Sequence, residues 1–251
     1  MTGRDTTGPE ALLGGRVLLD QGGAGLRATI EPVLLAAAVP AKPGEAVLEA
    51  GTGIGTASLC LLARVPEARA VGVESDPAQA ERAAANAALN GWSERFAAIA
   101  GDIADPATAR AAAGQGPFAH AMANPPWFSG GSRPFEPARR LAKHGGGVGL
   151  AGWIGFLARR VRPRASVTLI LPTALLPDAL AGFAACGIGS PTLLPLWPRP
   201  DEPTKRVILS GLKGGRSPCR MLAGLVLHRP DGGFTAAAEA VLRHGEALPL
   251  A

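Results

Sequence analysis

Residues 46–55 read Ala-Val-Leu-Glu-Ala-Gly-Thr-Gly-Ile-Gly, and this stretch decides the fold. A short apolar run ends in an acid and a glycine-rich turn, and residues 57–65 continue as an apolar segment of helical length. The order is therefore strand, loop, helix. Glycines permit the tight turn and the close backbone approach to a ligand that such a loop needs. Because Thr56 stands where the dinucleotide fingerprint has its third glycine, the pattern disfavours NAD.

The alternation of apolar runs continues along the chain. Strands are expected at 46–48, 70–74, 96–100, 118–123 and 166–171, and helices at 57–65, 77–89, 106–113, 148–161 and 177–185. Further strands are expected at 193–197, 206–210 and 222–228, separated by Gly and Pro turns, which predicts a terminal antiparallel hairpin. Strands that alternate with helices predict an α/β fold with a mostly parallel sheet covered on both faces.

Length and composition indicate one domain. With 251 residues, 47% of them hydrophobic, the chain can bury one sizeable core. We expect a single domain over 16–244, which includes an N-terminal segment at 16–44. Residues 1–15 and 245–251 lack apolar periodicity and are expected to be poorly ordered tails.

Several classes of protein are disfavoured. The longest apolar stretches fall well short of the roughly 18 residues of a membrane span, and the N-terminus does not read as a secretory signal. The 3 cysteines are odd in number and far apart, so neither a disulfide framework nor a zinc site is expected, and a reducing cytoplasm fits best. The 4 histidines show no paired spacing. We therefore expect no membrane and no metal.

Acidic side chains follow the expected strands. Glu49 and Glu74 end the first and second strands, and Asp102 follows the third. Parallel strands end at one edge, where an open α/β sheet leaves a crevice for ligands. An acid about 20 residues past the glycines is placed to accept hydrogen bonds from the hydroxyls of a ribose, and Asp102 from the exocyclic amine of an adenine. The predicted cofactor contacts are Glu49, Gly51, Gly53, Gly55, Glu74 and Asp102.

The tetrapeptide Asn124-Pro125-Pro126-Trp127 follows the expected strand 118–123 at the same edge. Its two prolines lack N–H donors, so the local carbonyls are free to accept hydrogen bonds from a ligand. An amine attached to a planar ring or carbonyl is a poor nucleophile because its lone pair is delocalised. The Asn124 side-chain oxygen and the Pro125 carbonyl can each accept one N–H of such an amine and orient its lone pair. Trp127 offers a face on which a base stacks. We predict that these four residues are catalytic; the alternative is a proline-rich turn with a core Trp.

These elements resemble the class I methyltransferases, whose adenosylmethionine occupies the crevice at the strand ends. The resemblance implies a Rossmann-like, mostly parallel seven-stranded sheet, adenosylmethionine as the cofactor, and Asn124 among the cofactor contacts. The tetrapeptide is similar to the Asn-Pro-Pro-Tyr signature of amino-methyltransferases, which modify adenine N6, guanine N2 or the glutamine side-chain amide. Trp127 replaces the usual Tyr and lacks its hydroxyl, so the resemblance leaves the acceptor amine open.

Residues 21–35, ahead of the first strand, narrow the resemblance. They read Gln-Gly-Gly-Ala-Gly-Leu-Arg-Ala-Thr-Ile-Glu-Pro-Val-Leu-Leu. They are similar to a segment of the bacterial tRNA1(Val) adenine N6-methyltransferase family that lies against the methionine end of the cofactor. Leu26 and Glu31 depart from the Tyr and Asp of that segment. The resemblance covers most of the chain and implies cofactor contacts by Arg27 and Thr29.

The charge of the chain suggests a polyanionic partner. A net charge of +5 with a pI near 9.7 favours attraction to phosphates, although a solvated basic face has the same composition. Residues 131–164 hold eight Lys or Arg against one acid, and residues 199–229 hold seven against two. Members of the resembled family modify an adenosine just 3′ of the anticodon in a valine tRNA, and a loop base is readily splayed into a pocket. Residues 129–147 are expected to hold the specificity for RNA. The implied contacts to tRNA are Phe128, Arg133, Arg139, Arg140 and Lys143.

Three alternatives stay open. A protein glutamine N5-methyltransferase normally carries a helical domain of several dozen residues ahead of its first strand, where this chain has only about 45 residues. A small-molecule amine methyltransferase would leave the basic stretches unexplained. A non-catalytic RNA-binding or assembly subunit on the same scaffold would have no need of Asn124, Glu74 and the glycines. The oligomeric state does not follow from the sequence.

Overall fold

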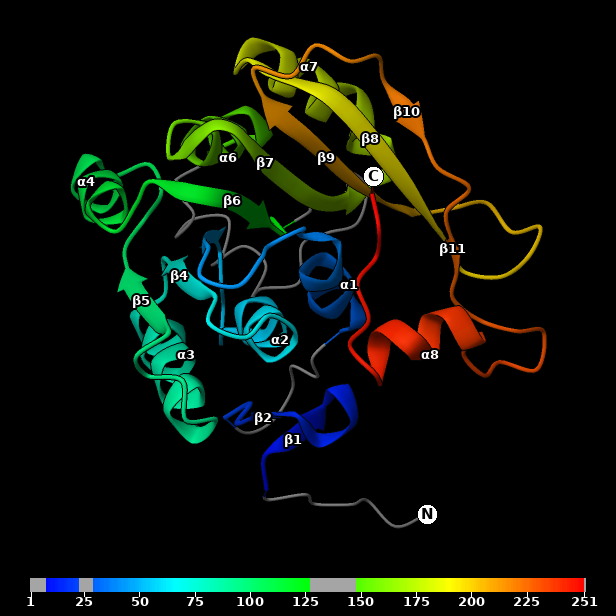
Figure 1. Cartoon of the computed structure of the whole chain (residues 1–251), viewed down its shortest axis with the longest axis horizontal. Helices are drawn as coiled ribbons and strands as arrows, with labels where there is room; N and C mark the ends of the chain where they lie inside the picture. Colours follow the sequence, from blue (N-terminus) through cyan, green and yellow to red (C-terminus); the bar gives the residue numbers. More distant parts are fainter. Residues whose placement is uncertain (1–7, 23–28, 127–147, 251) are drawn as a thin grey trace, which may run out of the picture.

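A sheet of mostly parallel strands crosses the molecule, with helices on both faces (Figure 1). The computed structural model describes residues 8–22, 29–126 and 148–250. Its strands are β1 (Glu10–Leu12), β2 (Val17–Leu19), β3 (Ala46–Ala50), β4 (Arg69–Glu74), β5 (Phe96–Ala100), β6 (Phe118–Ala123), β7 (Val161–Pro172), β8 (Ile188–Trp197), β9 (Arg206–Lys213), β10 (Arg220–Met221) and β11 (Leu225–Val226). Its α-helices are α1 (Ile30–Ala38), α2 (Thr56–Arg64), α3 (Pro77–Leu89), α4 (Pro106–Gly114), α6 (Leu150–Ala158), α7 (Leu176–Ala185) and α8 (Ala236–Leu242), and its 3-10 helices are η1 (Leu13–Gly15) and η2 (Thr173–Leu175).

The large sheet has the strand order β5-β4-β3-β6-β7-β9-β8, and the two-residue strands β10 and β11 both pair with β8. Strands β5, β4, β3, β6 and β7 are parallel, whereas β9 is antiparallel to β7 and β8. The strand order reverses between β3 and β6, which is the switch point where an open α/β sheet binds ligands. The predicted α/β class, the mostly parallel sheet and the C-terminal antiparallel hairpin are confirmed.

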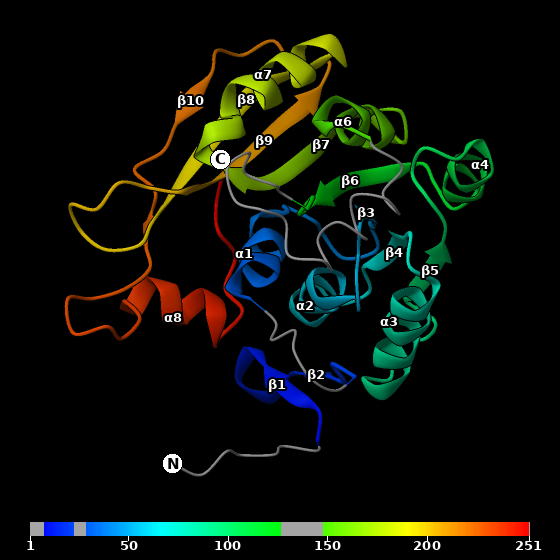
Figure 2. The same cartoon turned by 180° about the vertical axis from the view of Figure 1, so that it is seen from behind.

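Each face of the sheet has its own apolar core. Helices α1, α2 and α3 cover one face, and α4, α6 and α7 cover the other (Figure 2). Side chains alternate between the two cores along each strand, as the two-residue period of a strand requires. In β7, for example, Val167, Leu169 and Leu171 belong to one core and Ile170 to the other. Because both faces are buried, the strands appear in the sequence as continuous apolar runs.

Two helices begin in the same way. Asp76 caps α3 by accepting a hydrogen bond from the Ala78 N–H, and Asp105 caps α4 by accepting one from the Ala107 N–H. A proline follows each cap at the first helical position, where its missing N–H leaves no helical hydrogen bond unmade. This local chemistry explains why the starts of both helices were predicted correctly.

The predicted N-terminal tail over 1–15 is wrong for residues 10–15. Strand β1 pairs with β2 in an antiparallel hairpin, and Leu13 between them is 3% exposed. Strands of three residues hold too few apolar positions to produce a detectable period, so the hairpin escaped the sequence pattern. Residues 1–7 lie outside the described residues.

The C-terminal prediction also needs correction. The strand expected at 222–228 is reduced to β11, which is parallel to β8. Gly224 interrupts it with a φ of 91°, and a Cβ there would lie 2.5 Å from Nε1 of Trp197. Helix α8 was not predicted. The expected tail at 245–251 is tied to the core, because the Leu248 N–H donates to the Ala37 carbonyl at 2.8 Å.

Candidate active site

Four strand ends meet at the carboxyl edge of the sheet. Ala50 of β3 pairs with Val73 of β4 and with Ala123 of β6, while Glu74 pairs with Ala100 of β5. The segments that follow these strands therefore begin side by side. They are the glycine loop (residues 51–55), the acid that ends β4, the turn after β5, and the tetrapeptide after β6. The sequence-predicted cofactor loop and reactive tetrapeptide thus begin as neighbours at the switch point of the sheet.

The glycine loop follows a left-handed path. Gly51, Gly53 and Gly55 have φ values of 68°, 55° and 90°, in a region that residues with a Cβ rarely adopt. The Gly51 N–H donates to the Val73 carbonyl at 2.8 Å, which fastens the loop to β4. A Cβ at Gly51 would lie 2.7 Å from Cη2 of Trp153. Glycine is therefore needed here both for the turn and for the approach of α6, a contact that the sequence pattern does not reveal.

Glu74 holds the glycine loop from the end of β4. Its Oε2 accepts a hydrogen bond from the Gly53 N–H at 2.9 Å. Its Oε1 accepts hydrogen bonds from the Asp76 N–H at 3.0 Å and from the Ser75 hydroxyl at 3.2 Å. The side chain is 7% exposed. The carboxylate is thus held in one orientation, and its Oε2 keeps a lone pair for a further donor such as a ribose hydroxyl.

Glu49 lies deeper, with 3% of its surface exposed. Its Oε2 accepts hydrogen bonds from the Thr52 hydroxyl at 2.8 Å, the Ser58 hydroxyl at 2.5 Å and the Ser58 N–H at 3.0 Å. Burial raises the pKa of Glu49 to about 7, although these hydrogen bonds oppose the rise, and the charge of Glu74 adds to it. Glu49 therefore joins the glycine loop to the first turn of α2. A direct contact between Glu49 and a cofactor stays a prediction.

The tetrapeptide begins at the residue after β6. Asn124 is half-buried, Pro125 is buried and Pro126 is exposed. Because Ala123 pairs with Ala50, the Asn124 backbone lies beside the first glycine of the loop. Asp102 follows β5 and is half-buried; its Oδ1 accepts a hydrogen bond from the N–H of the residue two positions later. The predicted residues outside the described part of the chain are Arg27, Trp127, Phe128, Arg133, Arg139, Arg140 and Lys143.

An ion pair anchors the start of α1 to the same edge. Arg206 Nε donates to Glu31 Oε1 at 2.7 Å, and the Thr29 hydroxyl donates to the other carboxylate oxygen at 3.1 Å. Arg206 pairs with Pro172, the last residue of β7, so the ion pair lies at the carboxyl edge. Glu31, which departs from the Asp of the resembled family, therefore has a defined partner in this chain.

Asn86 of α3 and Asn90, the residue that caps its C-terminus, hold β2, a role that the sequence analysis missed. Asn90 Oδ1 accepts from the Leu18 N–H at 2.9 Å, and its Nδ2 donates to the Leu18 carbonyl at 2.7 Å. Asn86 Oδ1 accepts from the Asp20 N–H at 2.7 Å, and its Nδ2 donates to the Asp20 carbonyl at 3.2 Å. Asn86 Nδ2 also donates to the Ile54 carbonyl of the glycine loop at 3.0 Å. The two amides thus supply the hydrogen bonds of a neighbouring strand.

A signal for this pair was present in the sequence. Asn86 and Asn90 are four residues apart, so they share one face of an Ala-rich helix. Asn86 is fully buried, and a buried amide needs hydrogen-bond partners. The sequence did not identify those partners, because the chain from residue 20 to residue 86 has to fold before the two meet.

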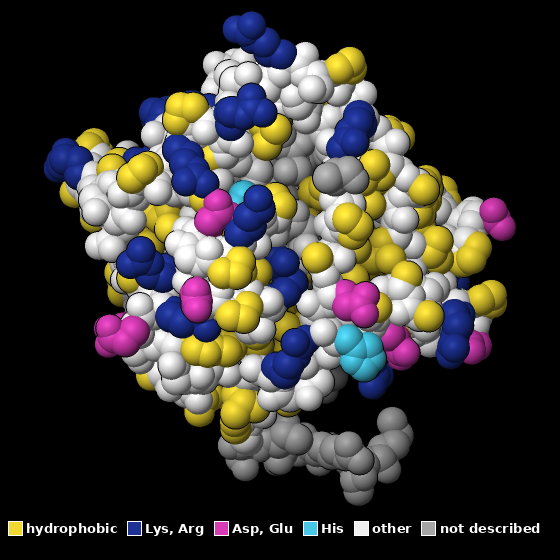
Figure 3. All heavy atoms as spheres, in the orientation of Figure 1, with side chains coloured by type: hydrophobic (Ala, Val, Ile, Leu, Met, Phe, Trp, Pro, Cys, Tyr) yellow, Lys and Arg dark blue, Asp and Glu magenta, His cyan; other side chains and the backbone are white. Residues whose placement is uncertain are grey.

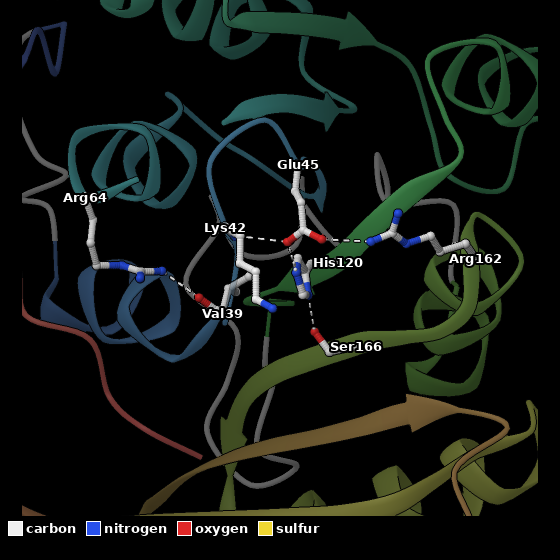
Figure 4. Close-up of polar contacts among 7 residues, drawn as sticks. All are labelled: Val39, Lys42, Glu45, Arg64, His120, Arg162 and Ser166. Atoms are coloured by element: carbon white, nitrogen blue, oxygen red, sulfur yellow. Dashed lines mark hydrogen bonds and ion pairs between the residues drawn. The ribbon is translucent and has the colours of Figure 1, made fainter. Parts of the chain in front are cut away.

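The opposite, amino edge of the sheet holds a polar cluster around His120 (Figure 4). Ser166 Oγ lies 2.8 Å from His120 Nδ1, and Glu45 Oε2 lies 3.0 Å from Nε2. Glu45 also accepts a hydrogen bond from the Lys42 N–H at 2.9 Å and pairs with Arg162 at 2.7 Å. A neutral imidazole has one donor and one acceptor, so its partners assign Nε2–H as the donor to Glu45 and Nδ1 as the acceptor from Ser166.

Burial shapes the charge states in this cluster. It lowers the pKa of His120, although the hydrogen bond to Glu45 opposes the change. Burial raises the pKa of Glu45, but the hydrogen bonds and charges of its neighbours, His120 first among them, outweigh burial and leave that pKa below its ordinary value. Ser166 is only 2% exposed, so its hydroxyl is closed to substrates. The hydrogen-bonded side chains of Ser166, His120 and Glu45 therefore connect neighbouring elements of the sheet and do not form a hydrolytic site.

Neither a metal site nor a membrane-spanning helix is found in the described part of the chain. Within it, no group of three His, Cys, Asp or Glu side chains is arranged to hold a metal ion. No helix in the described ranges has the length and apolar character needed to cross a membrane.

Comparison with known proteins gives consistent relatives. The chain is 31% identical to a tRNA1(Val) (adenine(37)-N6)-methyltransferase of Aeromonas hydrophila over 204 residues, which cover 81% of this chain and 83% of the relative. It is also 31% identical over 194 residues to a protein of the same description from Porphyromonas gingivalis, with 76% of each chain covered. No family model matches the sequence.

Solved structures show the same fold. A predicted O-methyltransferase from Agrobacterium tumefaciens superposes with a TM-score of 0.71 and 22% identity, over 87% of this chain and 98% of that one. An adenosylmethionine-dependent O-methyltransferase from Thermotoga maritima superposes with a TM-score of 0.54 and 14% identity, over 79% of this chain and 70% of that one. At these identities the likeness concerns the fold alone.

Proposed function

The chain belongs to the tRNA1(Val) (adenine(37)-N6)-methyltransferase family, and from this premise we propose that it methylates N6 of an anticodon-loop adenosine in a tRNA. Its methyl donor is adenosylmethionine. The observation that carries the proposal for this chain is the pairing of Ala50 with Ala123, because it sets the tetrapeptide beside the glycine loop. An amine bound by the tetrapeptide then lies within reach of a methyl group on a cofactor bound at the glycine loop.

The residues at the carboxyl edge fit adenosylmethionine. The left-handed glycines keep Cβ atoms away from the loop, so a ligand can approach its backbone. The Glu74 carboxylate is already held at the end of β4, where it can accept the two ribose hydroxyls once the Ser75 hydroxyl turns away from Oε1. We assign Gly51, Gly53, Gly55 and Asp102 to the remaining nucleoside contacts. Arg27 and Thr29 are proposed for the methionine end, and Thr29 is positioned through Glu31.

The chemistry follows from the acceptors of the tetrapeptide. When bound, adenosylmethionine supplies an electrophilic methyl group on a positively charged sulfur. The Asn124 side-chain oxygen and the Pro125 carbonyl accept the two N–H groups of the adenine amine and turn its lone pair toward that methyl group. The nitrogen–carbon bond forms as the sulfur–carbon bond breaks, and the extra proton on nitrogen leaves to solvent. Pro126 keeps the turn rigid, and Trp127 is proposed to stack on the base.

The RNA is proposed to approach over residues 127–147. Phe128 would extend the stacking surface. The proposed phosphate contacts are Arg133, Arg139, Arg140 and Lys143. Such contacts position a nucleic acid without reading its sequence. An anticodon-loop base is splayed out more readily than a base in a stacked duplex. As tRNA is the proposed substrate, we propose the cytoplasm as the site of action.

The first test measures transfer of tritiated methyl from adenosylmethionine to total tRNA from a strain that lacks the endogenous activity. Nucleoside analysis of the labelled tRNA is expected to place the label in N6-methyladenosine. A matched reaction with tRNA from the parent strain, already methylated at that site, should take up little label. Equal labelling of both tRNA pools would contradict the assignment of the site.

The chief rival is methylation of a protein glutamine amide, whose acceptor also needs two hydrogen-bond acceptors. The same reaction mixture, supplied with release factor in place of tRNA, distinguishes the two. Label in methylglutamine without label in RNA would replace the proposed substrate but keep the roles of Asn124 and Pro125.

A further inference from the structure

Strands β7 and β8 both bulge at the amino edge of the sheet. Between its pairings with Phe118 and His120, β7 advances five residues while β6 advances two. Between its pairings with Leu212 and Ser210, β8 advances three residues while β9 advances two. Bulges re-aim side chains and are common beside functional sites. Strand β9 runs between the two bulged strands, so both irregularities border one region.

The bulged residues have an uncommon backbone conformation. Arg164 of β7 has a φ of 64°, and Ser190 of β8 has a φ of 53°. A left-handed conformation is unfavourable for a residue with a Cβ and persists only where the surroundings enforce it, which is frequent at ligand sites. The turn after β9 packs on the second bulge, because the Ser217 N–H donates to Ser190 Oγ at 2.8 Å. A Cβ at Gly215 would lie 2.6 Å from the same oxygen.

A cavity of about 560 Å³ lies between these features. Its charged lining residues are Arg164, Lys213 and Arg216, and no acid lines it. Arg164 and Arg216 are exposed, and neither forms an ion pair with an acid in the described part of the chain. The hydroxyls of Ser190 and Ser217 complete the polar lining. Such a set offers only cations and hydroxyls, which suits a phosphate group.

The basic character continues around the cavity. Figure 3 shows Lys and Arg side chains gathered over the part of the molecule that holds α6 and the amino ends of β6 and β7, with few acids among them. Exposed Arg159 and Arg162 lie in this part of the chain. A charged surface of this extent favours a polyanion over a single small anion, since each neutralised phosphate adds to the affinity.

The distance to the candidate active site matches a nucleic acid. Six residue steps separate Ser166, beside the bulge, from Pro172 at the carboxyl edge, which is roughly 20 Å at about 3.3 Å per residue. An A-form RNA duplex of several base pairs covers this length. An RNA stem whose loop lies at the carboxyl edge therefore reaches the cavity.

We propose that the cavity between the bulges of β7 and β8 binds backbone phosphates of the RNA substrate, away from the base that is methylated. The inference rests on the proposed tRNA function. In this arrangement the amino edge binds the RNA stem, and the tetrapeptide binds the base in the RNA loop. Arg164 and Arg216 are the phosphate contacts, and Ser190 and Ser217 shape the cavity.

The test replaces both arginines, as Arg164→Asn with Arg216→Gln. Asparagine tolerates the left-handed conformation at position 164, so the bulge is kept. The matched control is Arg229→Gln with Arg243→Gln, two exposed arginines away from the cavity whose loss changes the net charge equally. The measurements are the dissociation constant for unmodified tRNA across a salt series, together with kcat and the KM for adenosylmethionine.

The cavity variant is expected to bind tRNA about 10-fold more weakly, with a salt slope reduced by about 1 to 2. Its kcat and its KM for adenosylmethionine should stay at the wild-type values, and the control pair should change tRNA binding much less. The phosphate site would be overturned if both pairs of substitutions lowered the affinity for tRNA equally, or if the cavity pair did not lower it. In either case, tRNA binding by the wild type would still support the proposed function. Absence of tRNA binding by the wild type would overturn both proposals. Binding of inorganic phosphate by the wild type, with tRNA affinity unchanged in the cavity variant, would reassign the cavity to a free anion.

Discussion

The two edges of one sheet are built by different means. At the carboxyl edge, glycines and backbone N–H groups form the loop, and the charged side chains around that loop are the acids Glu49, Glu74 and Asp102. At the amino edge, side chains from different elements bond to one another around His120, and exposed arginines such as Arg164 carry the charge. The sulfonium cofactor is cationic and the RNA is anionic. The acids around the glycine loop thus suit the proposed cofactor, and the arginines of the amino edge suit the proposed RNA stem.

Among the substitutions that test this comparison, Asn124→Ala should have the largest effect on activity. Removing the side-chain acceptor should lower kcat by about 100-fold or more, as the loss of one prearranged hydrogen-bonding group does in other active sites. Cofactor affinity should change far less than kcat, because the nucleoside contacts lie on the other loops. Single-turnover kinetics and calorimetry on the same preparation measure the two effects. Unchanged turnover would contradict the role of the amide.

Replacing Glu74 should produce the converse result. Glu74→Ala removes a charged hydrogen-bond acceptor, worth about 1.5–3 kcal/mol, so calorimetry should find roughly 10-fold to 100-fold weaker adenosylmethionine binding. Glu74→Gln keeps one oxygen acceptor and should lose less. If both variants bind the cofactor as tightly as the wild type, the ribose contact is wrong.

Asn86→Ala and Asn90→Ala form a matched pair. Each leaves partly buried backbone groups at Leu18 or Asp20 without their protein partner, so each should lower the free energy of unfolding by about 1 kcal/mol in denaturant titrations. Only Asn86 also bonds the glycine loop, through Ile54. Cofactor binding should therefore weaken several-fold in Asn86→Ala alone. Equal affinities in the two variants would show that the hairpin does not position the loop.

The two edges should also respond to pH with opposite sign. Burial raises the pKa of Glu49 from 4.5 to about 7, so its contribution to stability is present below pH 4.5 and is lost as the pH rises through about 7. Burial lowers the pKa of His120 below 6.5, so its contribution is present above pH 6.5 and is lost as the pH falls through the folded pKa.

Denaturant titrations over a pH series separate these two terms. Glu49→Gln should flatten the decline in stability between pH 4.5 and 7, whereas His120→Gln should flatten the decline on the acid side of pH 6.5. A pH profile that neither substitution changes would contradict both assignments.

The carboxyl edge was largely predictable because its signals are local. The glycine loop, the acid Glu74 and the tetrapeptide each occupy a few consecutive residues directly after an apolar run, so their common edge follows from the βα alternation. The structure leaves the proposed contacts themselves as predictions. The predicted site residues between 127 and 147 lie outside the described ranges.

The features that escaped prediction depend on long-range packing. The bulge of β7 is a change of register against β6, and β11 pairs in parallel with β8 beside the close approach of Gly224 to Trp197. Trp153 reaches the glycine loop from about 100 residues away in sequence. None of these contacts leaves a periodic signal in its own segment, since each is decided by the shape of a distant partner.

The clamp between α3 and β2 also sets an order of events during synthesis. Asn90 lies 72 residues after the Leu18 backbone that it holds. At a translation rate of about 5–20 residues per second, roughly 4 to 14 s separate the appearance of the two. For that interval the nascent hairpin has no partner on its open side. Slower codons in the stretch before α3 would therefore prolong the exposure of the newborn chain.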